Sequence, residues 1–420
     1  MNIYQCIQRL MEGKMDEAEH IRREVLTNGT DDERYALAEE LQNLGFLEEA
    51  LELYEKVLEN NPEEGGLLVS IAEVYIDMNN EDEALVTLEK MDRNDPAYVE
   101  ALLLLADLYE AQGLFEVSEQ KLLEAEKLAP EEPVIQFALA ELYASIGKFQ
   151  QAVYKYEQVL KETDEIGNIN IYKRLAETYS AGGDFEKALP LYEKALDQRL
   201  DIDVLFGYGF TAYQAGKYSK AIEKLTEAKE LDPEYYSLYL PLARSYEHKE
   251  NLNASYETVK EGIKVNPYQK ELYFYAGKIC LKLGKEEEAE HYFQKAIELD
   301  PSYIEAYYTL NKLYLKQENY EKIIELVEPL LEEGEEDPHI LWDYAKSCEE
   351  EERYDEALKA YRRAYSYLKE NDEFLQDYGF FLLQEGFHDE AIEIFNKLYK
   401  MDPANVEYLD ILERLKGSDW

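Results

Sequence analysis

This sequence has few cysteines, which can cross-link a chain, few prolines, which restrict its backbone, and few basic residues. The 420 residues include 3 cysteines, 12 prolines and 2 tryptophans, and 44 Lys and Arg stand against 92 Asp and Glu, for a formal net charge of −48. Three cysteines are too few for the disulfide framework of a small secreted protein. The excess of negative charge repels nucleic acid and anionic membranes, so we expect neither as a partner.

Long apolar runs are also missing. No stretch approaches the run of about eighteen apolar residues that a membrane-spanning helix requires. The opening stretch, MNIYQCIQRLMEGKMDEAEH, lacks the basic leader and apolar core of a secretory signal. We therefore predict a cytoplasmic protein without membrane insertion.

The patterns that mark catalytic, metal-binding and cofactor-binding sites do not occur. The sequence has no H-E-x-x-H, C-x-x-C, G-x-S-x-G, G-x-G-x-x-G or G-K-[ST]. The histidines are scattered over separate segments, at His20, His248, His291, His339 and His388. The sequence predicts no catalytic residue, no metal ligands and no cofactor, and therefore a protein that is not an enzyme.

What the sequence does have is a period. Small residues recur on a grid of 34 residues, at Ala50, Ala84, Ala152, Ala289, Ala357 and Ala391, with Ser118 and Ser255 in the same slot. Each lies in an amphipathic stretch that follows a turn and ends near a proline, as in residues 46–62, FLEEALELYEKVLENNP. Another amphipathic stretch precedes it, as in residues 67–75, LLVSIAEVY. Each repeat is therefore predicted to be two helices joined by a turn.

This pattern resembles the tetratricopeptide repeat (TPR). The resemblance rests on a large residue at repeat position 4, Leu-Ala or a close variant at 7 and 8, Tyr at 11, Gly at 15, Ala at 20, an aromatic residue or Leu at 24 and Pro at 32. A degenerate repeat has Ala18 in the small slot. Repeats 1 to 11 follow it and begin at Asp31, Gly65, Val99, Pro133, Ile169, Ile202, Tyr236, Lys270, Ile304, Pro338 and Asp372.

Glycine and proline mark the ends of the predicted helices. Position 15, where the first helix ends and the chain needs a left-handed residue to turn, holds Gly45, Gly113, Gly147, Gly183, Gly216, Gly284 and Gly386. Position 32, where the second helix stops, holds Pro62, Pro96, Pro130, Pro233, Pro267, Pro301 and Pro403.

The resemblance implies an all-α, right-handed superhelical solenoid of helix-turn-helix repeats with a C-terminal capping helix. We divide the sequence into a degenerate N-terminal repeat at 1–30, repeats at 31–166, repeats at 169–405, and a capping helix with a tail at 406–420. The capping helix is predicted to cover the last repeat with one apolar face, formed by Val406, Leu409, Leu412 and Leu415. A frayed tail is the alternative.

The array is irregular at residues 164–203. Two residues exceed the period, two positions lack the usual proline, and one proline falls inside a predicted helix: Gly167 and Asn168, Asp164 and Leu200, and Pro190. A proline inside a helix removes a hydrogen bond and tends to bend the helix. We interpret this stretch as a candidate change in curvature, with ordinary repeat drift as the alternative.

In the TPR family, positions 2, 5, 9 and 12 of the first helix line a concave surface, so the resemblance places these positions in a groove. Position 9 has five acids, an aromatic residue, four bases and another aromatic residue: Glu39, Glu73, Asp107, Glu141, Glu177, Phe210, Arg244, Lys278, Lys312, Lys346 and Phe380. Position 5 is mostly apolar or aromatic: Tyr35, Val69, Leu103, Phe137, Lys173, Phe206, Leu240, Phe274, Tyr308, Trp342 and Gln376. We expect partner binding at the charged residues and Phe210 of position 9, and at the aromatic residues of position 5. The groove would be acidic at 31–166 and largely basic at 169–405.

Departures from the family pattern narrow the function. TPR domains that hold the C-terminal carboxylate of heat-shock chaperones use Lys at position 5 and Asn at position 9. Here Lys173 is the only base at position 5, and no repeat has Asn at position 9. We predict a scaffold or adaptor that binds an extended or helical segment of a partner protein in its groove. The alternatives are a peptide-responsive regulator and an RNA-binding helical repeat that uses the bases at 244–346.

Overall fold

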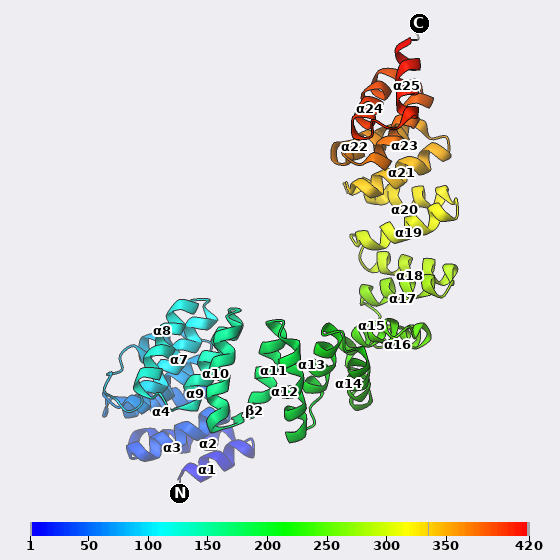
Figure 1. Ribbon diagram of the computed structural model, residues 1–420. Helices are drawn as coiled ribbons and strands as arrows, with labels where there is room; N and C mark the ends of the chain where they lie inside the picture. The colour runs from blue at the N-terminus through cyan, green and yellow to red at the C-terminus, as the bar shows by residue number, and fades with distance from the viewer. Residues whose placement is uncertain (1, 335, 418–420) are drawn as a thin grey trace. The chain divides into compact units, whose positions relative to one another are not determined.

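The computed structural model describes residues 2–334 and 336–417, and most of these residues are helical (Figure 1). The chain forms two compact units, an N-terminal unit at Met1–Thr211 and a C-terminal unit at Ala212–Trp420. The boundary lies within helix α13, Ile202–Gln214.

Both units are built from short helices. The N-terminal unit contains α1 (Asn2–Met11), α2 (Met15–Asn28), α3 (Asp31–Asn43), α4 (Leu47–Leu58), α5 (Gly65–Asp77), α6 (Glu81–Leu88), α7 (Tyr98–Ala111), α8 (Phe115–Leu128), α9 (Pro133–Ser145), α10 (Phe149–Glu162), α11 (Ile171–Ala181) and α12 (Phe185–Gln198). The C-terminal unit contains α14 (Tyr218–Leu231), the 3-10 turn η1 (Tyr236–Leu238), α15 (Tyr239–His248), α16 (Leu252–Val265), α17 (Lys270–Lys282), α18 (Glu286–Leu299), α19 (Ile304–Lys316), α20 (Tyr320–Glu332), α21 (Pro338–Glu350), α22 (Tyr354–Leu368), α23 (Asp372–Gln384), α24 (His388–Met401) and α25 (Val406–Gly417). Within residues 2–334 and 336–417, none of these helices combines the length and the apolar character needed to cross a membrane.

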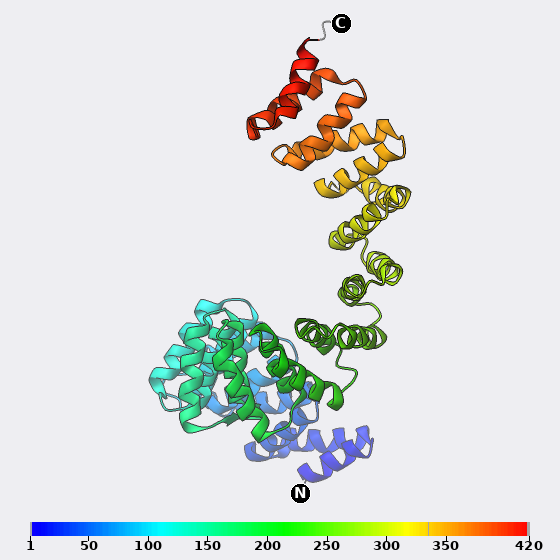
Figure 2. The ribbon, with the colours of Figure 1, turned by 45° about the vertical axis from the view of Figure 1, so that its right-hand side comes forward.

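Consecutive helices pack in pairs, which confirms the predicted repeat. Helix α3 packs against α4, α9 against α10 and α21 against α22, and successive pairs then contact one another, as α4 contacts α5. Figure 2 shows such pairs stacked in the C-terminal unit. Several first helices begin at the predicted first residue of their repeat, among them α3, α5, α9, α17, α19, α21 and α23. Each unit is therefore an all-α solenoid.

The small residues lie where two helices cross. Ala289 at position 20 is fully buried, and so are Ser118 and Ser255, which fill the same slot in other repeats. Position 8 is a further small slot, because a Cβ added to Gly277 would lie 2.6 Å from the ring of Phe293. Carbon atoms that are not bonded prefer separations of about 3.5 to 4 Å. A larger side chain at either position would overpack the repeat.

One left-handed residue makes the turn between the helices of each repeat. All seven glycines predicted for position 15 have a positive φ, from 72° at Gly216 to 83° at Gly45. Four other repeats adopt the same conformation without glycine, at Asn79 (59°), Glu250 (59°), Glu318 (55°) and Glu352 (57°). The packing of the helix pair therefore dictates this backbone conformation even where the residue does not favour it.

The final helix is present and buries Leu412 as predicted, but the rest of its buried face differs from the one expected. Helix α25 packs against α24, and its buried residues are Tyr408, Ile411 and Leu412. Val406 and Leu409 were expected on the covered face, but they are 67% and 38% exposed, so this part of the prediction was wrong. The reason is the bulky ring of Tyr408, which lies 6.1 Å from the ring of Phe395 and determines the side on which the helix docks.

The irregular stretch at 164–203 contains a hairpin and a continuous helix. The additional residues make the turn between strands β1 (Glu165–Ile166) and β2 (Ile169–Asn170), which pair antiparallel, and Gly167 has a φ of 59°. Asn170 then caps α11 by accepting a hydrogen bond of 2.9 Å from the backbone N–H of Lys173. Pro190 occupies an exposed position inside α12, and this helix continues past it to Gln198.

Candidate functional site

Positions 5 and 9 of a repeat are four residues apart on the first helix and therefore share a face. In the described part of the chain, no position-9 residue is buried, and at position 5 only Val69 is buried. This face therefore presents its side chains to solvent in both units. We refer to Glu39, Glu73, Asp107, Glu141 and Glu177 of the N-terminal unit as the acidic column. We refer to Arg244, Lys278, Lys312 and Lys346 of the C-terminal unit as the basic column.

Three members of the acidic column, Glu73, Asp107 and Glu177, have a raised pKa. Burial, followed by the charge of Glu110, raises the pKa of Asp107 to about 6. Burial also raises the pKa of Glu73, with neighbouring carboxylates as the lesser cause. For Glu177, burial raises the pKa and outweighs the opposing charge of Arg174. Burial of the carboxyl group is the main cause of the raised pKa of Asp107, although the residue as a whole remains exposed.

Two members of the acidic column are joined by one arginine. Arg174, at position 6 of repeat 5, donates from Nε to Glu141 at 2.8 Å, and its Nη1 lies 3.0 Å from Oε2 of Glu177. The hydroxyl of Tyr156 also donates to Glu141. The position-9 side chain of one repeat thus reaches position 6 of the next. Among the described residues, no ion pair joins the remaining members of the column, which are Glu39, Glu73 and Asp107.

The same contact recurs at two places in the basic column. Nζ of Lys312 lies 3.1 Å from Oδ1 of Asp343, and Nζ of Lys346 lies 2.8 Å from Oδ2 of Asp377. Both aspartates are at position 6 of the following repeat. Sequence reasoning missed these two aspartates because it considered each repeat position alone. Comparing position 9 of one repeat with position 6 of the next would have revealed the charge pairs.

Asp343 is the most unusual polar group of this face. It is only 2% exposed, and its Oδ2 has no hydrogen-bond partner among the described residues. Burial raises its pKa, and the charge of Lys312 is the main opposing influence. The Asp343 carboxylate therefore depends on Lys312 for its compensation.

The first two members of the basic column differ from the last two. Arg244 and Lys278 are both exposed, and in the described structure neither has a carboxylate within ion-pair distance. The Arg244 guanidinium lies 5.6 Å from the centre of the Tyr275 ring, and Lys278 Nζ lies 5.7 Å from that of Phe274. These cation–π contacts hold the side chains in place without neutralising their charge.

Aromatic rings accompany the basic column. Nζ of Lys312 lies 5.2 Å from the centre of the Tyr308 ring, and Nζ of Lys346 lies 5.9 Å from that of Trp342. Trp342 also donates from Nε1 to Asp377 at 2.9 Å. Further ring contacts extend this cluster, with centroid separations of 5.2, 6.1 and 6.5 Å for Phe274–Tyr303, Tyr308–His339 and His339–Trp342. The face therefore offers large, partly exposed rings beside positive charge.

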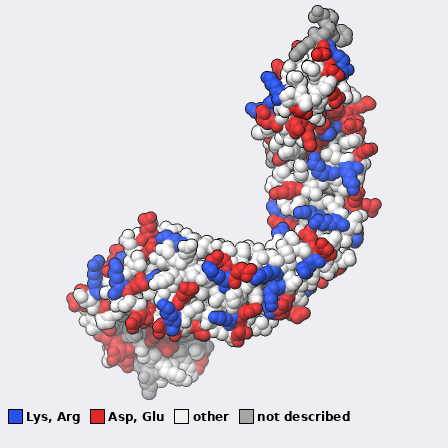
Figure 3. Space-filling view, in the orientation of Figure 1, with Lys and Arg blue, Asp and Glu red and all other residues white. Residues whose placement is uncertain are grey.

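The remaining predicted site residues are also accessible. Tyr35 is 37% exposed and bonds through its hydroxyl with Ser70 at 3.0 Å. Phe137 packs edge-on against Tyr156 at 6.1 Å. The rings of Phe206 and Phe210 stack at 5.8 Å. On the face seen in Figure 3, Lys and Arg side chains are interspersed with Asp and Glu.

Family models match segments of both units. Models described as "YpiA-like, tetratricopeptide repeats" and "YpiA-like, C-terminal tetratricopeptide repeats" match residues 110–164 and 338–405. Models described as "Tetratricopeptide repeat" match residues 45–96, 173–236, 270–303 and 292–325. The chain belongs to the TPR family. The TPR model that matches residues 270–303 coincides with repeat 8, whose first helix α17 begins at Lys270.

Relatives of this TPR protein include the "TPR repeat-containing protein YpiA" of Bacillus subtilis (strain 168). The two sequences are 45% identical over 267 residues, a match that spans 63% of each chain. Among solved structures, a TPR protein from Parabacteroides merdae is 18% identical with a TM-score of 0.44, and the match covers 60% of this chain and 99% of that one. YrrB, described as a TPR protein with an unusual peptide-binding site, is 18% identical with a TM-score of 0.38, covering 44% and 95%. These structural likenesses carry no functional information.

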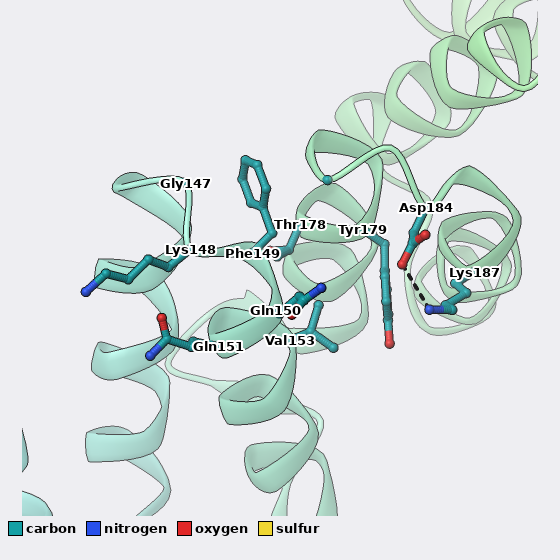
Figure 4. Close-up of a pocket in the computed structure, with 11 residues that line it drawn as sticks. Gly147, Lys148, Phe149, Gln150, Gln151, Val153, Thr178, Tyr179, Asp184 and Lys187 are labelled. Carbon is teal, nitrogen blue, oxygen red and sulfur yellow. Dashed lines mark hydrogen bonds and ion pairs between the residues drawn. The ribbon is translucent and has the colours of Figure 1, made fainter.

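The N-terminal unit also has pockets, and one of those described here is lined in part by Glu141 of the acidic column. A pocket of about 820 Å³ in the N-terminal unit lies between the turn that precedes α10 and the turn that precedes α12 (Figure 4). Lys148 and Lys187 line it, but each has a partner within the chain, Glu119 at 3.0 Å and Asp184 at 2.9 Å. Another pocket, of about 430 Å³, lies beside the hairpin and is lined by Lys173 and other polar residues. The polar rims of both pockets are largely satisfied by the chain itself.

Proposed function

We propose that this TPR protein is a scaffold or adaptor that binds an extended or helical segment of a partner protein on the face formed by positions 5 and 9. The observation that carries the proposal is the set of accessible aromatic side chains on that face. Tyr308 is 41% exposed, and Trp342 lies beside it between two lysines. Folding tends to bury such rings, whereas Trp, Tyr and Arg dominate the binding energy of protein interfaces.

The charged columns would determine which segments bind. The acidic column favours basic segments on the N-terminal unit, and the basic column favours acidic segments on the C-terminal unit. Apolar contacts with the rings would supply most of the affinity. Each unit could therefore select its own partner segment.

We also place the protein in the cytoplasm. Cys6, Cys280 and Cys348 are all free and buried, which supports a compartment where thiols stay reduced. Binding a partner segment requires no catalysis, in keeping with the proposal that the protein is not an enzyme.

The two alternatives use the same surface. RNA binding has less support than protein binding, because Asp343 and Asp377 compensate two of the four bases that would contact phosphates. A peptide-responsive regulator would bind a short peptide here and change the compactness of the array. Solution scattering with and without the bound peptide separates a regulator from a passive scaffold.

Affinity capture with charge-reversed variants tests the proposed function. The test variant carries Lys278→Glu, Lys312→Glu and Lys346→Glu. Its matched control carries Lys260→Glu, Lys264→Glu and Lys295→Glu on the second helices α16 and α18 of the same unit. Each variant is tagged and used to recover the principal partner from lysate, and circular dichroism checks that helicity is retained.

We expect the test variant to lose the partner and the control to retain it. The two variants have the same net charge, so general repulsion by an acidic chain affects them equally. If recovery by the test variant matches the wild type, the face of positions 5 and 9 is an ordinary solvated surface and the proposal is wrong.

A further inference from the structure

The four bases of the basic column are not equivalent. Resting on the proposed function, we infer that Arg244 and Lys278 bind the acidic end of a partner segment whose apolar end lies on Tyr308 and Trp342. The partner is therefore a peptide segment with carboxylate side chains at one end and aliphatic or aromatic side chains at the other.

Arg244 and Lys278 are available to a partner. Both are exposed, and among the described residues neither forms an ion pair. The two bases lie over the rings of Tyr275 and Phe274, and such contacts do not neutralise their charge. In a chain with a formal charge of −48, two neighbouring bases without a carboxylate form a local site where an acidic segment is attracted and not repelled.

Lys312 and Lys346 are already engaged. Lys312 compensates Asp343, which is 2% exposed and has one oxygen without a partner. If a partner's carboxylate drew Lys312 away, Asp343 would remain as a buried, uncompensated charge, which is strongly unfavourable. Lys346 shares the oxygen of Asp377 with the indole N–H of Trp342. These two lysines are thus occupied by the chain's own carboxylates and are not available to the partner's acids.

The charge of Lys278 acts on Glu247 and helps to lower the pKa of that carboxyl, but the two do not form an ion pair in the described structure. Glu247 instead accepts hydrogen bonds from Lys282 and Tyr275.

The repeat spacing sets the length of the segment. Arg244 lies in repeat 7 and Trp342 in repeat 10, three repeats apart at about 10 Å each, or roughly 30 Å. An extended chain advances about 3.3 Å per residue, so roughly nine residues separate the acidic end from the apolar end. A peptide of about twelve residues covers both ends.

The test uses labelled peptides of this length and the full chain. One peptide has three glutamates at one end and Leu, Phe and Leu at the other, a second has the same ends in reversed order, and a third replaces glutamate by glutamine. Fluorescence anisotropy measures Kd. In a Trp420→Phe background, Trp342 is the sole tryptophan and its emission reports contact with the apolar end.

Two variants separate the free bases from the engaged ones. The first, Arg244→Gln with Lys278→Gln, removes the two free charges. The second, Lys312→Gln, Asp343→Asn, Lys346→Gln and Asp377→Asn, removes both ion pairs together, so that no buried carboxylate remains to unfold the chain.

We expect the glutamate peptide to bind the wild type in at least one of its two arrangements of ends and to shift the Trp342 emission. Its Kd for the first variant should be at least tenfold higher. The second variant should change its Kd less than threefold, and the glutamine peptide should bind the wild type about as weakly as the glutamate peptide binds the first variant. Equal losses in both variants would overturn the assignment, and so would failure of every peptide to bind. If the glutamate and glutamine peptides bind equally and both shift Trp342, the acidic end is wrong while the proposed function stands. The capture experiment with the charge-reversed column decides the proposed function separately.

Discussion

Repeat 9 fills its core with residues that differ from those of its neighbours. Position 8 is Ala or Gly in the other repeats but Asn311 here, position 20 is Ile323, and position 24 is Val327, and all three are fully buried. The larger residue at position 20 accompanies a smaller one at position 24, so the volumes offset one another. Neither polar atom of the Asn311 side chain has a partner in the described structure. An unsatisfied buried amide costs about 1 to 3 kcal/mol.

The raised pKa of Asp107 predicts how stability responds to pH. Because burial raises the pKa of this group to about 6 from an ordinary value of 3.8, the folded chain favours its neutral form. The stabilisation is fully present below pH 3.8 and is lost as the pH rises through about 6. We expect Asp107→Asn to raise the melting temperature at pH 7.5 and to reduce the change between pH 7.5 and pH 5. Thermal unfolding followed by circular dichroism measures both quantities.

Asp300 provides the matched control of opposite sign. Its hydrogen bond from Lys270 is the main cause that lowers its pKa to about 2, so its stabilisation is present above pH 3.8 and is lost as the pH falls toward 2. Asp300→Asn should therefore lower the melting temperature at pH 7.5. If Asp107→Asn lowers it as well, the Asp107 carboxylate is stabilised by the fold, and the explanation by burial is wrong.

At the scale of helices and turns, the backbone strain at the left-handed position differs from one repeat to the next. Glycine adopts a positive φ at little cost, whereas other residues pay about 1 to 2 kcal/mol for a left-handed conformation. Glu250, Glu318 and Glu352 accept this cost at φ of 55° to 59°. Relieving this strain at all three turns would therefore raise the free energy of unfolding.

Replacing these glutamates by glycine should stabilise the C-terminal unit. The left-handed strain is relieved, but glycine loses about 0.5 to 1 kcal/mol more backbone entropy on folding, so we expect a net gain of about 0.5 to 1 kcal/mol at each of Glu250→Gly, Glu318→Gly and Glu352→Gly. Urea unfolding of the triple variant measures the sum. The triple alanine variant removes the same side chains and keeps the strain, so it should gain nothing. A gain shared by both variants would attribute the effect to lost negative charge instead.

Helices and turns were more predictable than the contacts between them. The 34-residue grid located the small slots and the glycine turns because each reflects a steric requirement within one repeat, as at Gly277 against Phe293. The docked face of α25 was not predictable from its period, because the ring of Tyr408 decided it. The pairing of Lys312 with Asp343 crosses between repeats, and reading the columns singly could not reveal it. The candidate site was therefore predictable as a set of accessible positions, whereas the charge state of each member was not.

At the scale of the whole molecule, the change of sign at position 9 follows the division into units. All five members of the acidic column lie in the N-terminal unit, and all four members of the basic column lie in the C-terminal unit. In a repeat array each repeat contacts only its neighbours, so stability is a sum of local terms and opening can begin within the array. Local differences between repeats therefore determine where the chain opens first.

We expect residues 164–203 to open before the regular repeats. Pro190 removes a backbone hydrogen bond from the interior of α12, which costs about 3 kcal/mol in a helix. Every 1.4 kcal/mol is a factor of about ten in an equilibrium constant, so amides around α12 should exchange with deuterium on the order of a hundredfold faster than those at 272–299. The hairpin is held by Gln198, which donates to Asp164 at 2.6 Å, and by Asn170, which donates to Gln198. These bonds protect the loop but not the helix interior, so Pro190→Ala should slow exchange in α12 and leave 272–299 unchanged. Equal protection of the two segments in the wild-type chain would show that the irregular stretch is ordinary variation between repeats.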